Sequence, residues 1–79
     1  MMSLIQTDQD SPKIIERARQ SIAKMADEVR RYRHDPGLWS SSAWKVTGYL
    51  TALVENYLIG SAMTVQLTQE KDKALSDAL

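Results

Sequence analysis

One long, nearly uncharged segment constrains the fold of this chain more than any other feature. Between Val46 and Gln69 the only charged residue is Glu55. Seven residues recur there at the three- and four-residue steps of one helix face: Val46, Leu50, Leu53, Tyr57, Gly60, Thr64 and Leu67. Further apolar and small residues lie beside this stripe. The segment therefore predicts a helix that is apolar nearly all round and, for that reason, buried nearly all round.

The preceding segment predicts a second helix of different character. Ser11 is a suitable N-cap, and Pro12 then occupies the first helical position, where its missing N–H costs nothing. Apolar residues follow at heptad-like steps: Ile15, Ala18, Ile22, Met25, Val29 and Tyr32. The remaining positions are mostly charged or polar. This pattern indicates a helix with one narrow apolar seam.

The joint between the two helices contains both tryptophans. Pro36 disfavours the α conformation at Asp35, and Pro36-Gly37 is typical of the centre of a type II turn. If Ser40 caps the next helix, Trp39 and Trp44 occupy the two positions of a hydrophobic staple. The alternative is that the tryptophans are exposed anchors for a partner, since tryptophan is enriched in binding hot spots.

These elements predict one all-α domain over residues 1–79, built as a two-helix antiparallel hairpin. Its expected parts are a flexible N-terminus over residues 1–10, a helix over 12–34, a turn over 35–40, a helix over 41–70 and a fraying tail over 71–79.

The two helices are mismatched, because the narrow seam of the first cannot cover the apolar faces of the second. Exposed apolar patches of that size are rare on soluble monomers. We therefore expect a second copy to supply the cover, so that two hairpins form a four-helix bundle in which small residues such as Gly48 and Ala52 let backbones approach closely. The expected oligomer interface consists of Val46, Leu50, Leu53, Tyr57, Gly60 and Leu67.

A different protein is the other source of cover, and its candidate contacts are Trp39, Trp44 and Glu55. Glu55 either lies on a solvated strip beside Lys45 and Gln66 or is buried at an interface against an arginine of the first helix. In the second case it would fix the register of the contact more than add stability.

A membrane span is a weaker alternative. The uncharged segment is long enough to cross a bilayer, but Glu55 and Asn56 would then lie near the midplane, where polar groups are costly. The N-terminus lacks the basic and apolar regions of a secretory signal. We expect a cytoplasmic protein.

The sequence offers little for catalysis or metal binding. It has no cysteine and one histidine, His34, whose neighbour Asp35 is expected to point away from it at the helix end. Its glycines match no phosphate-binding loop. We therefore expect no enzymatic activity, no metal site and no cofactor.

A cluster of arginines suggests nucleic acid as an alternative partner. Arg30, Arg31 and Arg33 surround Tyr32, but ten basic and ten acidic residues cancel over the whole chain. Cations at a helix C-terminus are favoured by the helix dipole alone, and no helix-turn-helix spacing is present. The pattern disfavours nucleic acid.

The expected function is therefore that of a small non-enzymatic protein–protein interaction module, acting as a homo-oligomeric helical bundle. An adaptor, an accessory subunit and an inhibitor of a larger partner all fit this description. The alternatives are a nucleic-acid-binding helical dimer that uses the arginine cluster and a single-span membrane protein.

Overall fold

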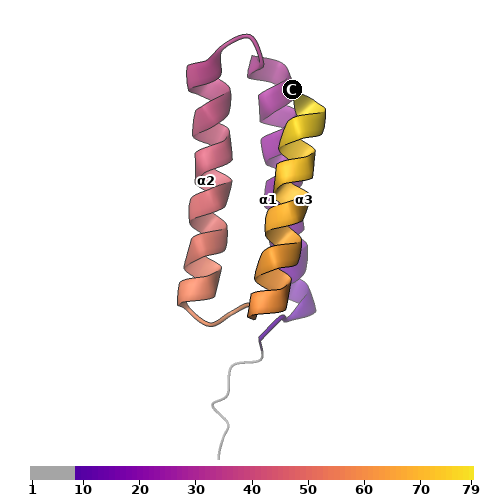
Figure 1. The fold of residues 1–79 in the computed structure, drawn as a ribbon, viewed down its shortest axis with the longest axis vertical. Coiled ribbons are helices and arrows are strands. Elements are labelled where there is room, and N and C mark those ends of the chain that lie inside the picture. The colour runs from indigo at the N-terminus through magenta and orange to yellow at the C-terminus, as the bar shows by residue number, and fades with distance from the viewer. Residues whose placement is uncertain (1–8) are drawn as a thin grey trace, which may run out of the picture.

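The computed structural model describes residues 9–79, which form three helices packed side by side (Figure 1). They are α1 (Pro12–Tyr32), α2 (Pro36–Glu55) and α3 (Ser61–Ala78). α1 and α3 run in the same direction and α2 runs opposite to both, so the C-terminus lies at the end where α1 turns into α2. The all-α class is confirmed. The two-helix hairpin is wrong, because the long apolar segment divides into two helices. Residues 1–8 of the expected flexible N-terminus lie outside the described residues.

The helix expected over residues 41–70 is interrupted by a Schellman turn. The N–H of Tyr57 donates to the Val54 carbonyl (3.0 Å), and the N–H of Leu58 donates to the Leu53 carbonyl (2.9 Å). These two bonds satisfy carbonyls at the end of α2 and reverse the chain. The turn requires a left-handed residue, and Tyr57 takes that conformation with φ 57°. Glycine is the usual residue there, so a tyrosine concealed the end of the helix in the sequence.

The chain before α1 is tied to the same turn. Gly60 is the N-cap of α3, and its N–H donates to Oδ1 of Asp10 (2.9 Å). The N–H of Asp10 donates in turn to the Leu58 carbonyl (3.0 Å). Asp10 thus connects the segment leading into α1 with the loop between α2 and α3, and it closes this end of the bundle.

The joint between α1 and α2 is shorter than expected. Asp35 has extended backbone angles and caps α2, its Oδ1 accepting from the N–H groups of Gly37 (3.1 Å) and Leu38 (3.3 Å). Pro36 is then the first helical residue, where proline is favoured. The turn predicted over residues 35–40 is therefore wrong, since most of it is the first turn of α2. α1 likewise ends at Tyr32 rather than at His34.

The proposed tryptophan staple is also wrong. Ser40 is not an N-cap, because it lies inside α2 with its hydroxyl donating to the Pro36 carbonyl. Trp39 is half-buried and packs against the core, whereas Trp44 is 71 % exposed. Five residues apart on a helix, the two indoles lie on different faces.

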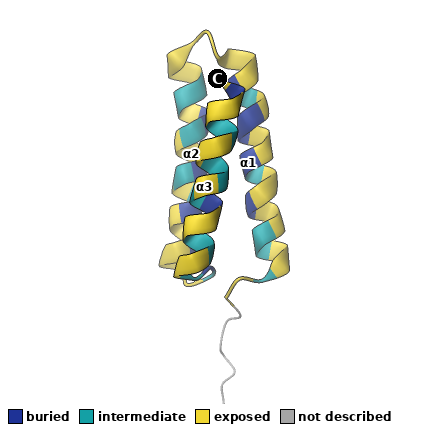
Figure 2. Cartoon of the chain, turned by 45° about the vertical axis from the view of Figure 1, so that its right-hand side comes forward, coloured by how far each residue is buried: buried dark blue, intermediate teal, exposed yellow. Residues whose placement is uncertain are grey.

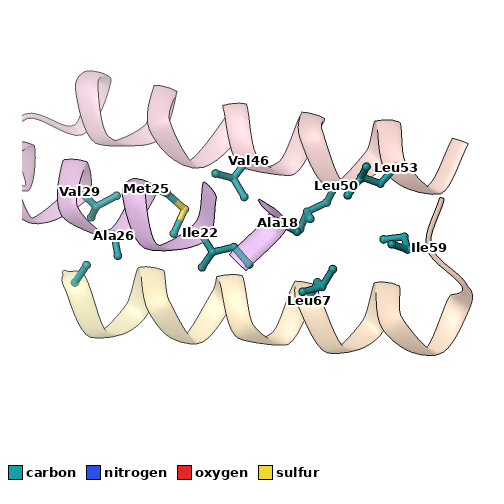
Figure 3. Close-up of a cluster of buried hydrophobic side chains, with 11 residues drawn as sticks. Ala18, Ile22, Met25, Ala26, Val29, Val46, Leu50, Leu53, Ile59 and Leu67 are labelled. Carbon is teal, nitrogen blue, oxygen red and sulfur yellow. The ribbon is translucent and has the colours of Figure 1, made fainter. Parts of the chain in front are cut away.

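The core lies between the three helices, where apolar side chains point inward (Figure 3). Its buried members are Ala18, Ile22, Met25, Ala26, Val29, Val46, Leu50, Leu53, Ile59, Leu67 and Ala78. Most of the predicted seam of α1 is among them, although Tyr32 is exposed. Ala26 widens this seam, and α1 packs against both α2 and α3. The expected fraying tail is the end of α3, where Ala78 is buried.

An ion pair joins α1 to α3 on the outside of the core. Arg19 donates from Nε and Nη2 to the two carboxylate oxygens of Glu70, at 2.9 and 2.8 Å. Gln66 also donates to Glu70 (3.3 Å). The hydrogen bonds from Arg19 are the main cause of a lowered pKa at Glu70. The two side chains are 47 % and 34 % exposed, so solvent and salt screen the attraction.

The left-handed tyrosine gives the first prediction. Tyr57→Gly should raise the free energy of unfolding by about 1 kcal/mol, because glycine adopts this conformation without the steric penalty of a Cβ. Tyr57→Ala keeps the Cβ and serves as the matched control, for which no such gain is expected. Urea unfolding followed by circular dichroism measures both variants. An equal gain in the two would show that the tyrosine ring, and not the backbone, is the source of the cost.

The Arg19–Glu70 pair gives a prediction for pH. A carboxylate whose pKa is lower in the folded than in the unfolded state contributes stability above its unfolded pKa, about 4.3, and that contribution is lost as the pH falls through the folded pKa. A double-mutant cycle with Arg19→Gln and Glu70→Gln should therefore show a favourable coupling at neutral pH. The coupling should vanish once Glu70 is protonated and weaken in high salt. A coupling that persists in acid would contradict this assignment.

Candidate functional site

One side of α2 is exposed to solvent but carries few charged residues, unlike the outer sides of α1 and α3. We call this side the α2 face and define it by Ser41, Trp44, Gly48, Thr51, Ala52 and Glu55, all of which are exposed. These residues recur at helical steps of three and four, so they lie opposite the buried Val46, Leu50 and Leu53. α2 is therefore not buried nearly all round, as the sequence suggested. One side of it closes the core and the other faces solvent.

Two aromatic side chains are associated with the α2 face. Trp44 lies on it and is 71 % exposed, and Tyr57 follows its last turn and is 74 % exposed. They are the most exposed large hydrophobic residues of the part of the chain that the structure describes. Exposed aromatic rings on a small protein are typical of contact surfaces, because burying them removes a large apolar area from water.

The charges near the α2 face are few and have no partner within the described chain. Glu55 lies on the face, and Lys45 lies on its edge. Neither takes part in an ion pair among residues 9–79. Glu55 also occupies the last turn of α2, which has no basic residue. A carboxylate is unfavourable there, because the exposed carbonyls give this helix end a partial negative charge.

Gly48 is a further unfavourable choice for an isolated helix. Glycine in a helix interior costs about 1 kcal/mol relative to alanine. A Cβ added at Gly48 would meet no atom within 4 Å, so packing inside the chain does not require the glycine. Ala52 lies one turn further along the same face. Gly48 and Ala52 therefore place only small groups between Trp44 and Glu55 on this face.

The outer sides of α1 and α3 differ, since their charges are partly matched within the chain. Besides the Arg19–Glu70 pair, Lys73 contacts Asp77 at 2.8 Å. The hydrogen bond from Lys73 to Asp77 mainly accounts for a raised pKa of this lysine. Figure 2 shows exposed residues along the outside of all three helices. Only α2 carries an exposed tryptophan among them.

The structure separates the residues that the sequence placed in one interface. Val46, Leu50, Leu53 and Leu67 lie in the core of the single chain, and Gly60 caps α3. Tyr57 alone among the six is exposed. Of the three candidate partner contacts, Trp39 packs against the core, while Trp44 and Glu55 share the α2 face.

Sequence reasoning missed Ser41 and Thr51 as members of this face, whereas it named Lys45 as a possible neighbour of Glu55. The signal that could have found them is their spacing, because Ser41, Trp44, Gly48, Thr51 and Glu55 recur at helical steps of three and four.

Two of the hollows among the described residues are lined by several residues of α2. The larger, of about 290 Å³, lies between α1 and α2 and is lined by both signs of charge, including Lys24, Glu28 and Lys45. The smaller, of about 110 Å³, lies between α2 and α3 and is lined by threonines and Lys71. Its lysine donates to Thr47 (3.2 Å) and contacts Asp72 (3.2 Å). The larger hollow also contains the hydroxyl groups of Ser21 and Ser42 beside its charged side chains.

The arginine cluster is divided by the end of α1. Arg30 contacts Asp27 at 2.9 Å, while Arg31 and Arg33 are exposed beside the last carbonyls of the helix. One of the three cations is therefore already matched. The position of the others agrees with the preference of a helix C-terminus for positive charge.

Residues 9–79 contain no group of three or more histidine, aspartate or glutamate side chains placed to hold a metal ion. Within the same range, no helix combines the length and the apolar character that crossing a bilayer requires. Comparison with models of protein families, with curated proteins and with solved structures gives no significant match.

The arginine cluster leads to a prediction about nucleic acid. Duplex DNA and structured RNA, titrated at about 150 mM salt, should bind no more tightly than micromolar, which is the range of nonspecific electrostatic contact. Fluorescence anisotropy with labelled oligonucleotides measures this. Sub-micromolar binding that is lost in the double variant Arg31→Ala/Arg33→Ala would contradict the prediction.

Proposed function

We propose that this chain is a small non-enzymatic protein–protein interaction module that acts as a homo-oligomeric helical bundle. The α2 face is the surface through which copies meet. The observation that carries the proposal is the exposure of Trp44 on a nearly uncharged helix face. Burying a tryptophan removes a large apolar area from water, and tryptophan supplies much of the binding free energy in many interfaces.

The third helix changes the form of the assembly that the sequence suggested. α3 supplies, within each chain, part of the cover that a second copy was expected to give. The proposed assembly therefore joins two three-helix units through α2 instead of interleaving two hairpins. Val46, Leu50, Leu53 and Leu67 hold each unit together, and Trp44, Gly48, Ala52 and Glu55 form the contact between units.

The size of the chain also supports association. A domain of 79 residues buries a small core, and such domains commonly gain stability from oligomerisation when disulfides and metals are lacking. An adaptor, an accessory subunit or an inhibitor of a larger partner needs no catalytic group. In a dimer formed through α2, the charged outer sides of α1 and α3 stay exposed on both copies.

Sedimentation equilibrium tests the proposal. The wild-type chain of 8.9 kDa should give at least twice its mass at micromolar concentration. Trp44→Glu should weaken association by at least about tenfold, because it places a charge in a desolvated contact. Circular dichroism should be unchanged, since Trp44 is outside the core.

Val65→Glu is the matched control, because Val65 is an exposed apolar residue on α3, away from the α2 face. It should associate like the wild type. A wild-type chain that stays monomeric into the high micromolar range would refute the proposed function, and equal weakening by both variants would place the contact elsewhere.

A further inference from the structure

The α2 face has a positive residue towards one end and a negative residue at the other. This arrangement distinguishes a parallel from an antiparallel contact between two copies. Lys45 and Glu55 have opposite signs and are separated by ten residues, or about 15 Å along the helix. Between Ser41 and Tyr57 no other residue is charged. If two α2 helices met in parallel about a twofold axis, each residue would lie level with its own copy. Lysine would then face lysine and glutamate would face glutamate, which is destabilising.

An antiparallel contact gives the opposite result. We propose that two copies of this chain pair antiparallel through α2, about a twofold axis level with Leu50, so that Lys45 of each copy lies level with the partner's Glu55. This inference rests on the proposed function and adds the orientation and register of the contact. Each dimer would contain the lysine–glutamate pair twice, because the twofold axis repeats it.

The same register matches the small residues. With the axis at residue 50, Gly48 lies level with the partner's Ala52, and Ala52 lies level with the partner's Gly48. Neither residue has a side chain long enough to hold two helices apart, so the axes can approach to the short end of the usual range of about 8–10 Å. This accounts for a glycine at a helical position where a Cβ would meet nothing in its own chain.

The register also accounts for Glu55 and Tyr57. The partner's Lys45 would bring a cation to the last turn of α2, where it offsets both the carboxylate and the exposed carbonyls. In this register Tyr57 lies only one residue away from the position level with the partner's Trp44. The two most exposed aromatic side chains would therefore meet at each end of the contact. Both residues are unfavourable in the isolated chain and gain a partner in the pair.

Charge reversal tests the orientation. Lys45→Glu and Glu55→Lys should each raise the dissociation constant of the dimer by at least about tenfold, because each turns two attractive pairs into repulsive ones. The double variant Lys45→Glu/Glu55→Lys should return to within about threefold of the wild type, since every pair is again attractive. Lys13→Glu makes the same charge change on the exposed start of α1 and should have no effect.

Cross-linking tests the register without changing these charges, and the chain has no native cysteine to interfere. Thr51→Cys lies close to the proposed axis, so a short bismaleimide should link it to its own copy. Ser41→Cys should not link, because the two copies would be about 27 Å apart along the helices. In a parallel dimer both positions would link equally.

The outcomes separate this inference from the function on which it rests. The antiparallel register would be overturned by a dimer that depends on Trp44 but is not weakened by single charge reversals and cross-links at Ser41→Cys. The proposed interaction module would still hold in that case. Single reversals that weaken the dimer, together with rescue by the double variant and a link only at Thr51→Cys, would support it. A monomeric wild type would refute both.

Discussion

The reversal at Asn56–Gly60 is the constraint on which the rest of the structure depends. Two backbone hydrogen bonds end α2 by satisfying the carbonyls of Leu53 and Val54, and they turn the chain so that α3 returns along α1. This return brings Leu67 into the core, where it is fully buried. A continuous helix over the same residues would have left the second half of the segment without any partner in the chain. Asp10 reinforces the turn from the other side by bonding to Leu58 and Gly60.

Local preference and the fold agree over most of the chain and disagree on one side of α2. Asp35 caps its helix, Pro12 and Pro36 start helices, and the seam of α1 is buried. By contrast, Gly48, Glu55 and Tyr57 each cost the isolated chain stability, through helix propensity, the helix dipole and a left-handed backbone respectively. Departures of this kind tend to gather at functional surfaces, where they are offset by something outside the local structure.

The sequence was sufficient for the helical class and for α1, because an apolar residue at every third or fourth position has one simple structural meaning. It was insufficient for the ends of α2. At Asp35-Pro36 two signals competed, a turn with Pro-Gly at its centre and a capped helix start, and the capping hydrogen bonds of Asp35 favoured the second. At Tyr57 the usual glycine was missing, and Gly60 fitted the spacing of the apolar stripe, so one continuous helix was expected. The candidate site was found only in part, since Trp44 and Glu55 were singled out but placed on a helix with the wrong ends.

The difference between α2 and its neighbours explains why association would use this helix. Covering α1 or α3 would remove water from ion pairs such as Arg19–Glu70 and Lys73–Asp77, and desolvation of charges is rarely repaid in full. Covering α2 desolvates mainly Trp44 and small side chains, while Lys45 and Glu55 stay at the rim. Rim charges contribute little affinity, but they set which orientation two identical surfaces adopt. The tryptophan would therefore supply most of the binding free energy. Because the lysine and glutamate have opposite signs, they would determine the relative orientation of the two α2 helices.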